Sequence, residues 1–597
     1  MNLRRFVVAP LTMLVSTMLL NGCGGGESEQ SATVAPTAKP SATSATAAPS
    51  PATAVAPVTV VATQQPLATG TILDKALPYF PYELDNVRYG GNFRMAVQRM
   101  IAQFDPKFNN QAITENLRWT YEKVMAWVPD ENDLLSHFEP LLAEKWDVSQ
   151  DLKTYTFTLR KGIRWQNIAP VNGRELVASD VVFSMNRYRE KDSIYISTYE
   201  QIDSINAPDK YTVVVKLKEP SAWGLNDLFP TGEYVVAPEV VQAYQGTIPS
   251  DAGIGTGPYL VKDYAFNVRA TYVRNPDYWR KDARGRQLPY TDSIEFVFAS
   301  DPATLVAGMR TKQLDFTQLT NQDIINLGKS SPETRVAISG VATGSSGFAF
   351  NSKRAPWNDV RVRRAFNMAL NKERYAQIVT VTPNWRHVGA MPWSLVSDDP
   401  FTADKLGPYY KYNPSESKRL RIEAGFPDGK IKVPTPFAFA HPSMTLRSTA
   451  YQALLKEEGI EFELQPLDFS TYAPYYYQRQ YKDIAISFQN GNDLTLNWVA
   501  QNKFQKDNSQ NTAFIDDPEV EKVIREIKVT TDPAKLREYA KFLWDYETLG
   551  VYTIWTPVEL SYYPTQARVK NFAVRSNFAF FGHQFTPWLA DAPRTSP

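Results

Sequence analysis

Residues 139–187 read EPLLAEKWDVSQDLKTYTFTLRKGIRWQNIAPVNGRELVASDVVFSMNR, and this stretch indicates the fold class. Tyr155, Phe157 and Leu159 alternate with threonines, a pattern of period two that predicts a strand with one buried and one solvated face. Residues 146–148 repeat the alternation before a polar turn. We therefore expect the two segments to pair as an antiparallel hairpin.

A short helix is expected to follow this hairpin. Asn172 and Gly173 form a turn signal. Ser179 is then the expected N-cap of a helix over residues 180–187, and Asp180 lies in the first turn, where a carboxylate is favourable. These residues alone predict an antiparallel sheet closed by a helix.

The composition limits the classes of function. The chain has 597 residues, more than one typical domain holds, so two or more lobes are expected. Its 64 lysines and arginines balance 63 aspartates and glutamates, and no basic excess indicates a nucleic-acid partner. The one cysteine cannot form an intramolecular disulfide, and the four histidines lie far apart. We therefore expect no metal site and no cofactor.

The N-terminus has the features of an export signal. Two arginines precede a mostly apolar run over residues 6–20, which is short for a membrane span. The sole cysteine, Cys23, follows Leu20-Asn21-Gly22, and these four residues resemble a bacterial lipobox. We expect a signal peptide over residues 1–22 and a lipid on the Cys23 thiol; an uncleaved membrane anchor is the alternative.

Residues 23–70 are expected to form a tether. Ala, Thr, Pro and Ser dominate this segment, which has few charges and no hydrophobic periodicity. Such a composition buries too little apolar surface to offset the entropy of ordering the chain. The tether would hold a folded region on the outer face of the cytoplasmic membrane.

Three motifs together carry a resemblance to a known family. They are residues 139–187, the pair GTGPY and RNPDYW at 255–259 and 274–279, and PWNDVRVRRAF at 356–366. The chain resembles the family 5 solute-binding proteins, the peptide, nickel and oligosaccharide receptors of ABC importers. The glycines of GTGPY also suggest a phosphate loop, but no Lys-Ser/Thr follows and the next segment is a hairpin pattern.

The resemblance implies a two-lobed, periplasmic-binding-protein-like α/β fold of the large type II (cluster C) kind, with a ligand cleft between the lobes. Lobe one would comprise residues 71–348 and 553–597, and lobe two residues 349–552. The crossing segments are expected near 348–351 and 551–556.

Two further helices are predicted from local patterns. Residues 115–127 place apolar side chains on one helical face. A second helix should begin after Asn358 as its N-cap, with Val362, Ala365 and Phe366 on its buried face.

The resemblance also indicates where the ligand-binding residues should lie. In peptide-binding relatives an aspartate after a lobe-two strand pairs with the ligand's α-amine, and residues 487–494 stand at that place here. An amide suits neutral, hydroxyl-rich ligands, whereas a carboxylate suits an ammonium. Candidates in this stretch are Phe488, Asn490, Asn492 and Asp493. Trp555 and Trp393 are candidates for stacking on the ligand, with a place in the core as the alternative, and Phe108 and Asn109 are weaker candidates.

The expected function is that of an extracytoplasmic, lipid-anchored receptor. It would capture an oligopeptide or similar solute as a monomer and deliver it to ABC permease subunits; an oligosaccharide or other neutral solute is the alternative ligand. We find no Gly-x-Ser-x-Gly elbow, HExxH, Walker A motif or cysteine nucleophile, so no catalytic residue is predicted. A sensor outside transport, or a glycoside hydrolase with paired carboxylates, remains the alternative of another class.

Overall fold

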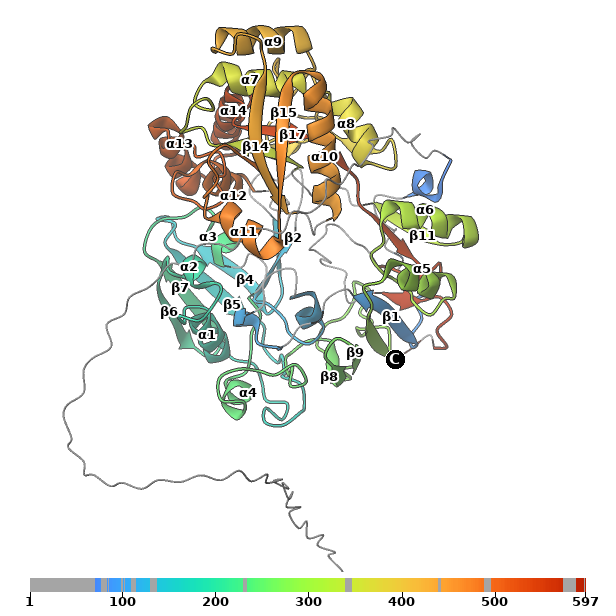
Figure 1. The fold of residues 1–597 in the computed structure, drawn as a ribbon. Helices are drawn as coiled ribbons and strands as arrows, with labels where there is room; N and C mark the ends of the chain where they lie inside the picture. Colours follow the sequence, from blue (N-terminus) through green and yellow to red (C-terminus); the bar gives the residue numbers. More distant parts are fainter. Residues whose placement is uncertain are drawn as a thin grey trace, which may run out of the picture. The chain divides into compact units, whose positions relative to one another are not determined.

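The structure is a computed structural model, shown in Figure 1. It describes residues 70–76, 83, 85–97, 100, 103–108, 114–128, 137–228, 233–338, 346–438, 442–487, 495–572, 587–594 and 596. All of them belong to one compact unit that runs from Val58 to Pro597. The predicted signal peptide, Cys23 and almost all of the predicted tether lie outside the described residues.

The hairpin predicted within residues 139–187 is confirmed. Strands β4 (Ala143–Val148) and β5 (Thr154–Leu159) pair antiparallel, in a four-stranded sheet of order β4-β5-β7-β6. Tyr155, Phe157 and Leu159 are buried, as the alternation predicts. Val148, by contrast, is 40% exposed, because β4 is an edge strand and this end of it faces solvent. The other two strands are β6 (Ile202–Asp209) and β7 (Thr212–Leu217).

A second four-stranded sheet has the order β1-β10-β9-β8. Its strands are β1 (Asn92–Val97), β8 (Tyr259–Ala265), β9 (Arg269–Arg274) and β10 (Ser293–Phe298). The segment after the GTGPY motif is the antiparallel β8–β9 hairpin and not a phosphate-binding turn before a helix. Both sheets share one hydrophobic core, whose buried residues come from 93–316 and 563–592.

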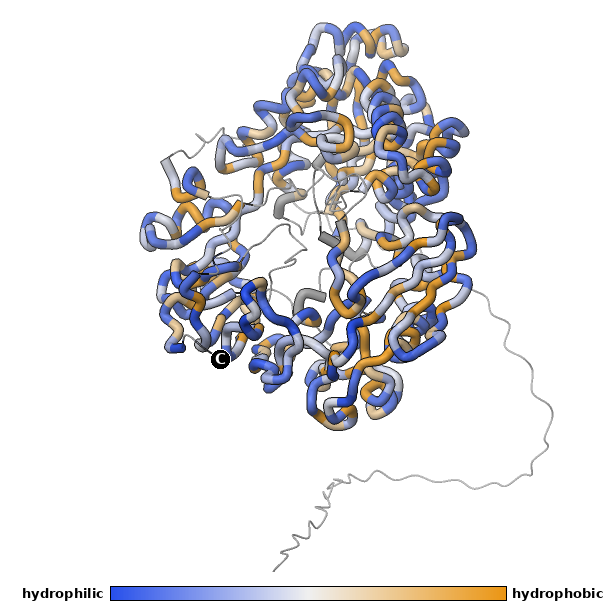
Figure 2. The backbone as a smooth tube through the Cα atoms, turned by 180° about the vertical axis from the view of Figure 1, so that it is seen from behind, coloured by the Kyte–Doolittle hydropathy of each residue, from blue (hydrophilic) through white to orange (hydrophobic). Residues whose placement is uncertain are grey.

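A separate core is built from residues 348–554. Strands β14 (Ile431–Ala438) and β15 (Ile460–Leu467) run parallel, with α10 (Pro442–Glu457) alongside them (Figure 1). Hydrophobic and hydrophilic residues are interspersed along the chain (Figure 2). The two cores fit the two-lobed α/β architecture.

The segments predicted to cross between the lobes lie side by side. Strand β12 (Ser346–Phe350) pairs antiparallel with β17 (Thr553–Thr556) on one side and with β16 (Ile484–Ser487) on the other. A Cβ added at Gly347 would overlap the carbonyl oxygen of Ile554, and the φ of Gly347 is +152°, so this position requires glycine. The close approach fixes the register of the two strands.

The remaining elements complete the fold. The helices are α1 (Ala178–Arg187), α2 (Ile196–Tyr199), α3 (Gly224–Leu228), α4 (Pro238–Ala243), α5 (Pro302–Arg310), α6 (Asn321–Ser330), α7 (Val360–Ala369), α8 (Lys372–Val379), α9 (Pro414–Glu423), α11 (Phe469–Tyr477), α12 (Leu496–Val499), the π-helix η5 (Ala500–Phe504), α13 (Pro518–Val529) and α14 (Pro533–Gly550). The strands are β2 (Met125–Val128), β3 (His137–Pro140), β11 (Arg335–Ile338), β13 (Trp385–Arg386), β18 (Val558–Glu559), β19 (Tyr562–Thr565), β20 (Val569–Lys570) and β21 (Trp588–Leu589).

The helix predicted over residues 115–127 is wrong. A 3₁₀ helix covers Thr114–Trp119, and the chain then extends into β2. Main-chain groups between these elements bond to distant segments: Thr120 O accepts from Gly257 N at 2.8 Å, and Glu122 O from Val235 N at 3.0 Å. These tertiary bonds replace the local ladder of a helix.

Both predicted N-caps are also wrong, by one or two residues. Helix α1 begins after Val177, whose N–H is bonded by the Asp180 carboxylate at 3.0 Å. Helix α7 is capped by Asp359, which accepts from Arg361 N at 2.8 Å. In each case a carboxylate satisfies a free N–H of the first turn.

A buried ion pair joins the C-terminal end of α1 to the segment that contains Asp105. Both Arg187 and Asp105 are buried, and the guanidinium donates two parallel hydrogen bonds of 2.9 and 2.6 Å to the carboxylate. We predict that Asp105→Ala lowers the free energy of unfolding by about 3–5 kcal/mol, because it leaves a buried guanidinium without its counter-ion. Urea unfolding followed by circular dichroism measures this change.

The control is Asp263→Ala, which removes a pair with Arg269 whose side chains are both well exposed. It should change stability little, because solvent screens such pairs. Equal losses in the free energy of unfolding for the two substitutions would show that the buried Asp105 pair stabilises the protein no more than an exposed pair.

Candidate ligand-binding pocket

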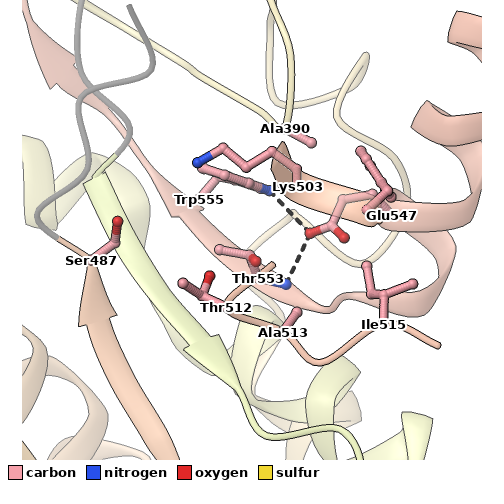
Figure 3. A pocket seen from close by; sticks show the side chains of 10 residues that line it. Ala390, Ser487, Lys503, Thr512, Ala513, Ile515, Glu547, Thr553 and Trp555 are labelled. Carbon is pink, nitrogen blue, oxygen red and sulfur yellow. Dashed lines mark hydrogen bonds between the residues drawn. The ribbon is translucent and has the colours of Figure 1, made fainter. Parts of the chain in front are cut away.

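A small pocket lies among β16, β17, η5 and α14 (Figure 3). Its volume of about 20 Å³ is enough for a group the size of a water molecule or an ammonium. The lining combines one acid, one base, hydroxyl groups, an indole and apolar side chains. The lining residues are Ala390, Ser487, Lys503, Phe504, Thr512, Ala513, Ile515, Glu547, Thr553 and Trp555.

Glu547 is held at the pocket by the chain reversal after α14. Val551 adopts a left-handed conformation, with φ +47°, and turns the chain back along the last turn of the helix. As a result Glu547 Oε1 accepts hydrogen bonds from Thr553 N at 2.8 Å and from Trp555 Nε1 at 3.2 Å (Figure 3). The carboxylate therefore orients the indole and fixes the start of β17.

The two charged side chains are both perturbed by burial. Burial raises the pKa of Glu547 to about 7, although Thr553 N, Trp555 Nε1, Arg363 and Lys503 all favour its ionised form. Burial lowers the pKa of Lys503 to about 8, against the opposing effect of Glu547. Both side chains therefore titrate near neutral pH, which is common at functional sites.

Lys503 lines the pocket together with Trp555 (Figure 3). Its ammonium is also 5.7 Å from the centre of the Trp498 ring. An ammonium in such an aromatic setting is attracted by the ring faces while the stem covers apolar surface. The basic wall of the pocket is therefore positioned by aromatic packing.

The structure places the predicted site residues as follows. Trp555 lines the pocket. Trp393 packs, partly buried, on the same hydrophobic cluster as Trp555 but does not line the pocket. Phe108 is half-buried beside Lys107, whose ammonium is 4.7 Å from its ring, and it does not line the pocket either. Asn109, Phe488, Asn490, Asn492 and Asp493 lie outside the described residues, although Ser487, which lines the pocket, directly precedes Phe488.

Glu547 and Lys503 were not predicted from the sequence. Glu547 lies among several other charged residues of α14, and Lys503 is a single lysine within the segment AQNKF, so neither stands out by composition or spacing. The only usable signal was the nearness of Glu547 to the strand VYTIWT, which does not show which way a side chain points. Their meeting depends on the Val551 turn.

The described residues contain neither a cluster of metal-ligating side chains nor a membrane-spanning helix. No group of three or more His, Cys, Asp or Glu side chains there is arranged to hold a metal ion. None of the helices in that part of the chain is both long and apolar enough to cross a membrane.

The architecture is that of the two-lobed periplasmic binding proteins. The substrate-binding protein CtaP of Listeria monocytogenes superposes with a TM-score of 0.70 at 17% identity, covering 84% of this chain and 100% of CtaP. The periplasmic binding protein DppA of Helicobacter pylori, solved with the peptide STSA, has a TM-score of 0.64 at 20% identity and covers 84% and 99% of the two chains. At these identities the likeness concerns the fold.

Sequence comparison identifies the family. The model of the bacterial extracellular solute-binding proteins, family 5, matches residues 137–511, and the chain belongs to this family. A Brucella ovis protein whose name assigns it to ABC-transporter peptide binding is 28% identical over 455 residues, which is 72% of this chain and 81% of its own length. The predicted family and fold are thus confirmed.

The buried carboxylate of Glu547 predicts a pH-dependent stability. The pKa of Glu547 is about 7 in the folded protein and 4.5 for an ordinary glutamate, as in the unfolded chain. Ionising this carboxyl group therefore costs more free energy in the folded protein than in the unfolded one. This penalty is absent below pH 4.5, grows as the pH rises and is complete above pH 7. Glu547→Gln keeps an acceptor oxygen and removes the charge.

We therefore predict that Glu547→Gln is more stable than the wild type at pH 8, by roughly 2–3 kcal/mol, and equally stable at pH 4. Urea unfolding at both pH values measures the difference. The matched control is Glu457→Gln, an exposed carboxylate paired with Arg374, which should show no such pH-dependent gain. A gain that is the same at pH 4 and pH 8 would contradict the assignment.

Proposed function

We propose that this protein is an extracytoplasmic receptor that captures an oligopeptide or a similar small solute and delivers it to the permease of an ABC importer. Membership of the family 5 solute-binding proteins over residues 137–511 is the observation that carries this proposal. We also propose the lobe boundaries 71–348 with 553–597, and 349–552. The ligand would favour the closed arrangement because it contacts both lobes.

The pocket at Glu547 is the proposed end of the ligand site. It lies at the end of β16, and the next residues are those in which peptide-binding relatives place the partner of the ligand amine. Asn490, Asn492 and Asp493 are therefore proposed to contact the ligand, with Phe488 and Trp555 supplying apolar contact. Trp393, Phe108 and Asn109 stay weaker proposals.

A peptide is the ligand class favoured by the chemistry of the pocket. The pocket has room for a group the size of an ammonium beside the Glu547 carboxylate, and the N-terminal ammonium of a peptide can pair with that carboxylate. The Brucella relative's name and the peptide bound to the Helicobacter protein point the same way. A neutral oligosaccharide is the second candidate, favoured by the amides of Asn490 and Asn492.

The family comprises substrate-binding receptors, and we propose that this member performs no covalent chemistry and acts as a monomer. The lipid anchor is proposed from Cys23, the only cysteine of the chain, which stands at the lipobox position. Two or more acyl chains on the mature N-terminus would hold the receptor stably at the membrane surface, and residues 23–70 would give it reach.

A ligand screen tests the proposed class. Thermal shift would be measured with di- to pentapeptides, with cello-, xylo- and malto-oligosaccharides, with opines and with nickel chelates. A ligand at 100 times its dissociation constant should add about 2.7 kcal/mol of stability. We expect a peptide to bind, and we expect Trp555→Ala to weaken it by about tenfold or more in titration calorimetry.

The control for that experiment is Trp146→Ala, which truncates a half-buried tryptophan on β4 outside the pocket. It should leave the dissociation constant unchanged. A sugar hit would replace the peptide by the second ligand class. No hit of any class from a folded protein would contradict the receptor function.

Substitution of Cys23 tests the anchor. We predict that Cys23→Ser abolishes incorporation of radiolabelled palmitate and moves the protein from the detergent phase to the aqueous phase of a Triton X-114 partition. Without the thiol no thioether to the lipid can form. Labelling and partition that stay as in the wild type would exclude lipidation at this residue. Ser44→Ala, in the predicted tether, is the control and should keep the lipid.

A further inference from the structure

One tryptophan of the first part of the chain is buried in the second part. Trp223 directly precedes α3 and is 1% exposed. It packs into a hydrophobic cluster formed by α12, η5, α13, α14, Trp555 and the loop over residues 390–410, called here the helical cluster. Among the buried residues that the structure describes, every other member of this cluster lies between Ala390 and Trp555. Trp223 is therefore a contact between the two predicted lobes.

Hydrogen bonds accompany the apolar contact. The Trp223 indole donates from Nε1 to Ile527 O at 2.8 Å, and the amide of Ala222 donates to Lys528 O at 2.8 Å. Ile527 and Lys528 belong to the last turn of α13, where carbonyl groups lack the usual donor four residues on, and Ile527 O also accepts from the C-cap Thr530 N at 3.3 Å. A buried indole N–H also requires an acceptor. The segment before α3 thus completes the C-terminal end of a helix in the other lobe.

The segment 221–224, which contains Trp223, is bonded to and packed against the β4-β5-β7-β6 sheet. The hydroxyl of Tyr155, on β5, donates to Ser221 O, and Ser221 N donates to Leu152 O at 3.1 Å. A Cβ added at Gly224 would overlap the Tyr155 ring, so the chain passes directly against this side chain. Movement of the sheet must therefore move Trp223.

The helical cluster also forms a wall of the ligand pocket. Phe504, Ile515 and Trp555 are buried members of the cluster and line the pocket as well. Interiors are close-packed, so a change in the packing of these shared side chains reaches both surfaces. The pocket and the binding surface for Trp223 are therefore both formed by the helical cluster.

We infer that Trp223 is a positioning residue that locks the β4-β5-β7-β6 sheet onto the helical cluster and couples this inter-lobe contact to the ligand pocket. The inference rests on the proposed receptor function, in which two lobes close on a ligand. By linkage, a ligand that tightens the cluster tightens the Trp223 contact, and loss of the contact weakens ligand binding by the same factor.

Hydrogen–deuterium exchange of the ligand-free full chain tests the lock. The amide of Ala222 exchanges only when its bond to Lys528 opens, so its rate reports the contact. Trp223→Ala should speed this exchange by about tenfold or more, and Trp223→Phe, which keeps the apolar insertion, by less. The matched control is Trp165→Phe, at a tryptophan equally buried in the first core, which should leave the Ala222 rate unchanged. An unchanged rate in both Trp223 variants would overturn the lock.

The coupling is tested in the same ligand-free protein through the pocket wall. Trp555→Ala removes a side chain shared by pocket and cluster and should speed exchange at Ala222 severalfold. Wild-type exchange at Ala222 in this variant would overturn the coupling. Neither exchange experiment contains a ligand. The inference about Trp223 can therefore fail while the peptide screen succeeds, and the peptide screen can fail while the inference holds. If trialanine binds in that screen, it should slow Ala222 exchange, and Trp223→Phe should weaken its binding by the same factor.

Discussion

The close approach of Gly347 to the carbonyl oxygen of Ile554 is the constraint on which the site depends. Only glycine leaves room for the two strands to pair there, and the pairing sets β16, β12 and β17 in one sheet. Ser487 and Trp555 then line the same pocket although 67 residues separate them in the sequence. The position of the candidate site is thus a consequence of backbone sterics at one residue.

The buried carboxylates Asp105, Asp315 and Glu547 differ in how their charge is compensated. Asp105 and Asp315 are each paired with an arginine. Arg568 donates hydrogen bonds of 2.7 and 2.8 Å to Asp315 and so connects the returning C-terminal segment to the first core. Glu547 instead accepts from neutral donors and keeps a raised pKa. A fully compensated carboxylate supports a structure, whereas an incompletely compensated one is typical of sites that gain a partner on binding.

Local patterns predicted those elements whose residues are stabilised by near neighbours. The β4–β5 hairpin, the β8–β9 hairpin and the buried face of α7 follow from alternation or helical spacing, and the structure has all three. The segment over 115–127 has an equally good helical pattern, yet its carbonyls bond to Val235 and Gly257. Spacing cannot distinguish a helix from a strand entry when both bury the same side chains.

The sequence by itself determined the family and the α/β class, because these rest on motifs and on burial patterns that the chain carries locally. It also singled out Trp555, since an aromatic residue in a predicted crossing strand is visible without coordinates. Only the tertiary structure decided that Glu547 and Lys503 share the pocket and that Trp223 reaches Ile527. Those contacts join residues far apart along the chain, and their energies arise only once the backbone has brought them together.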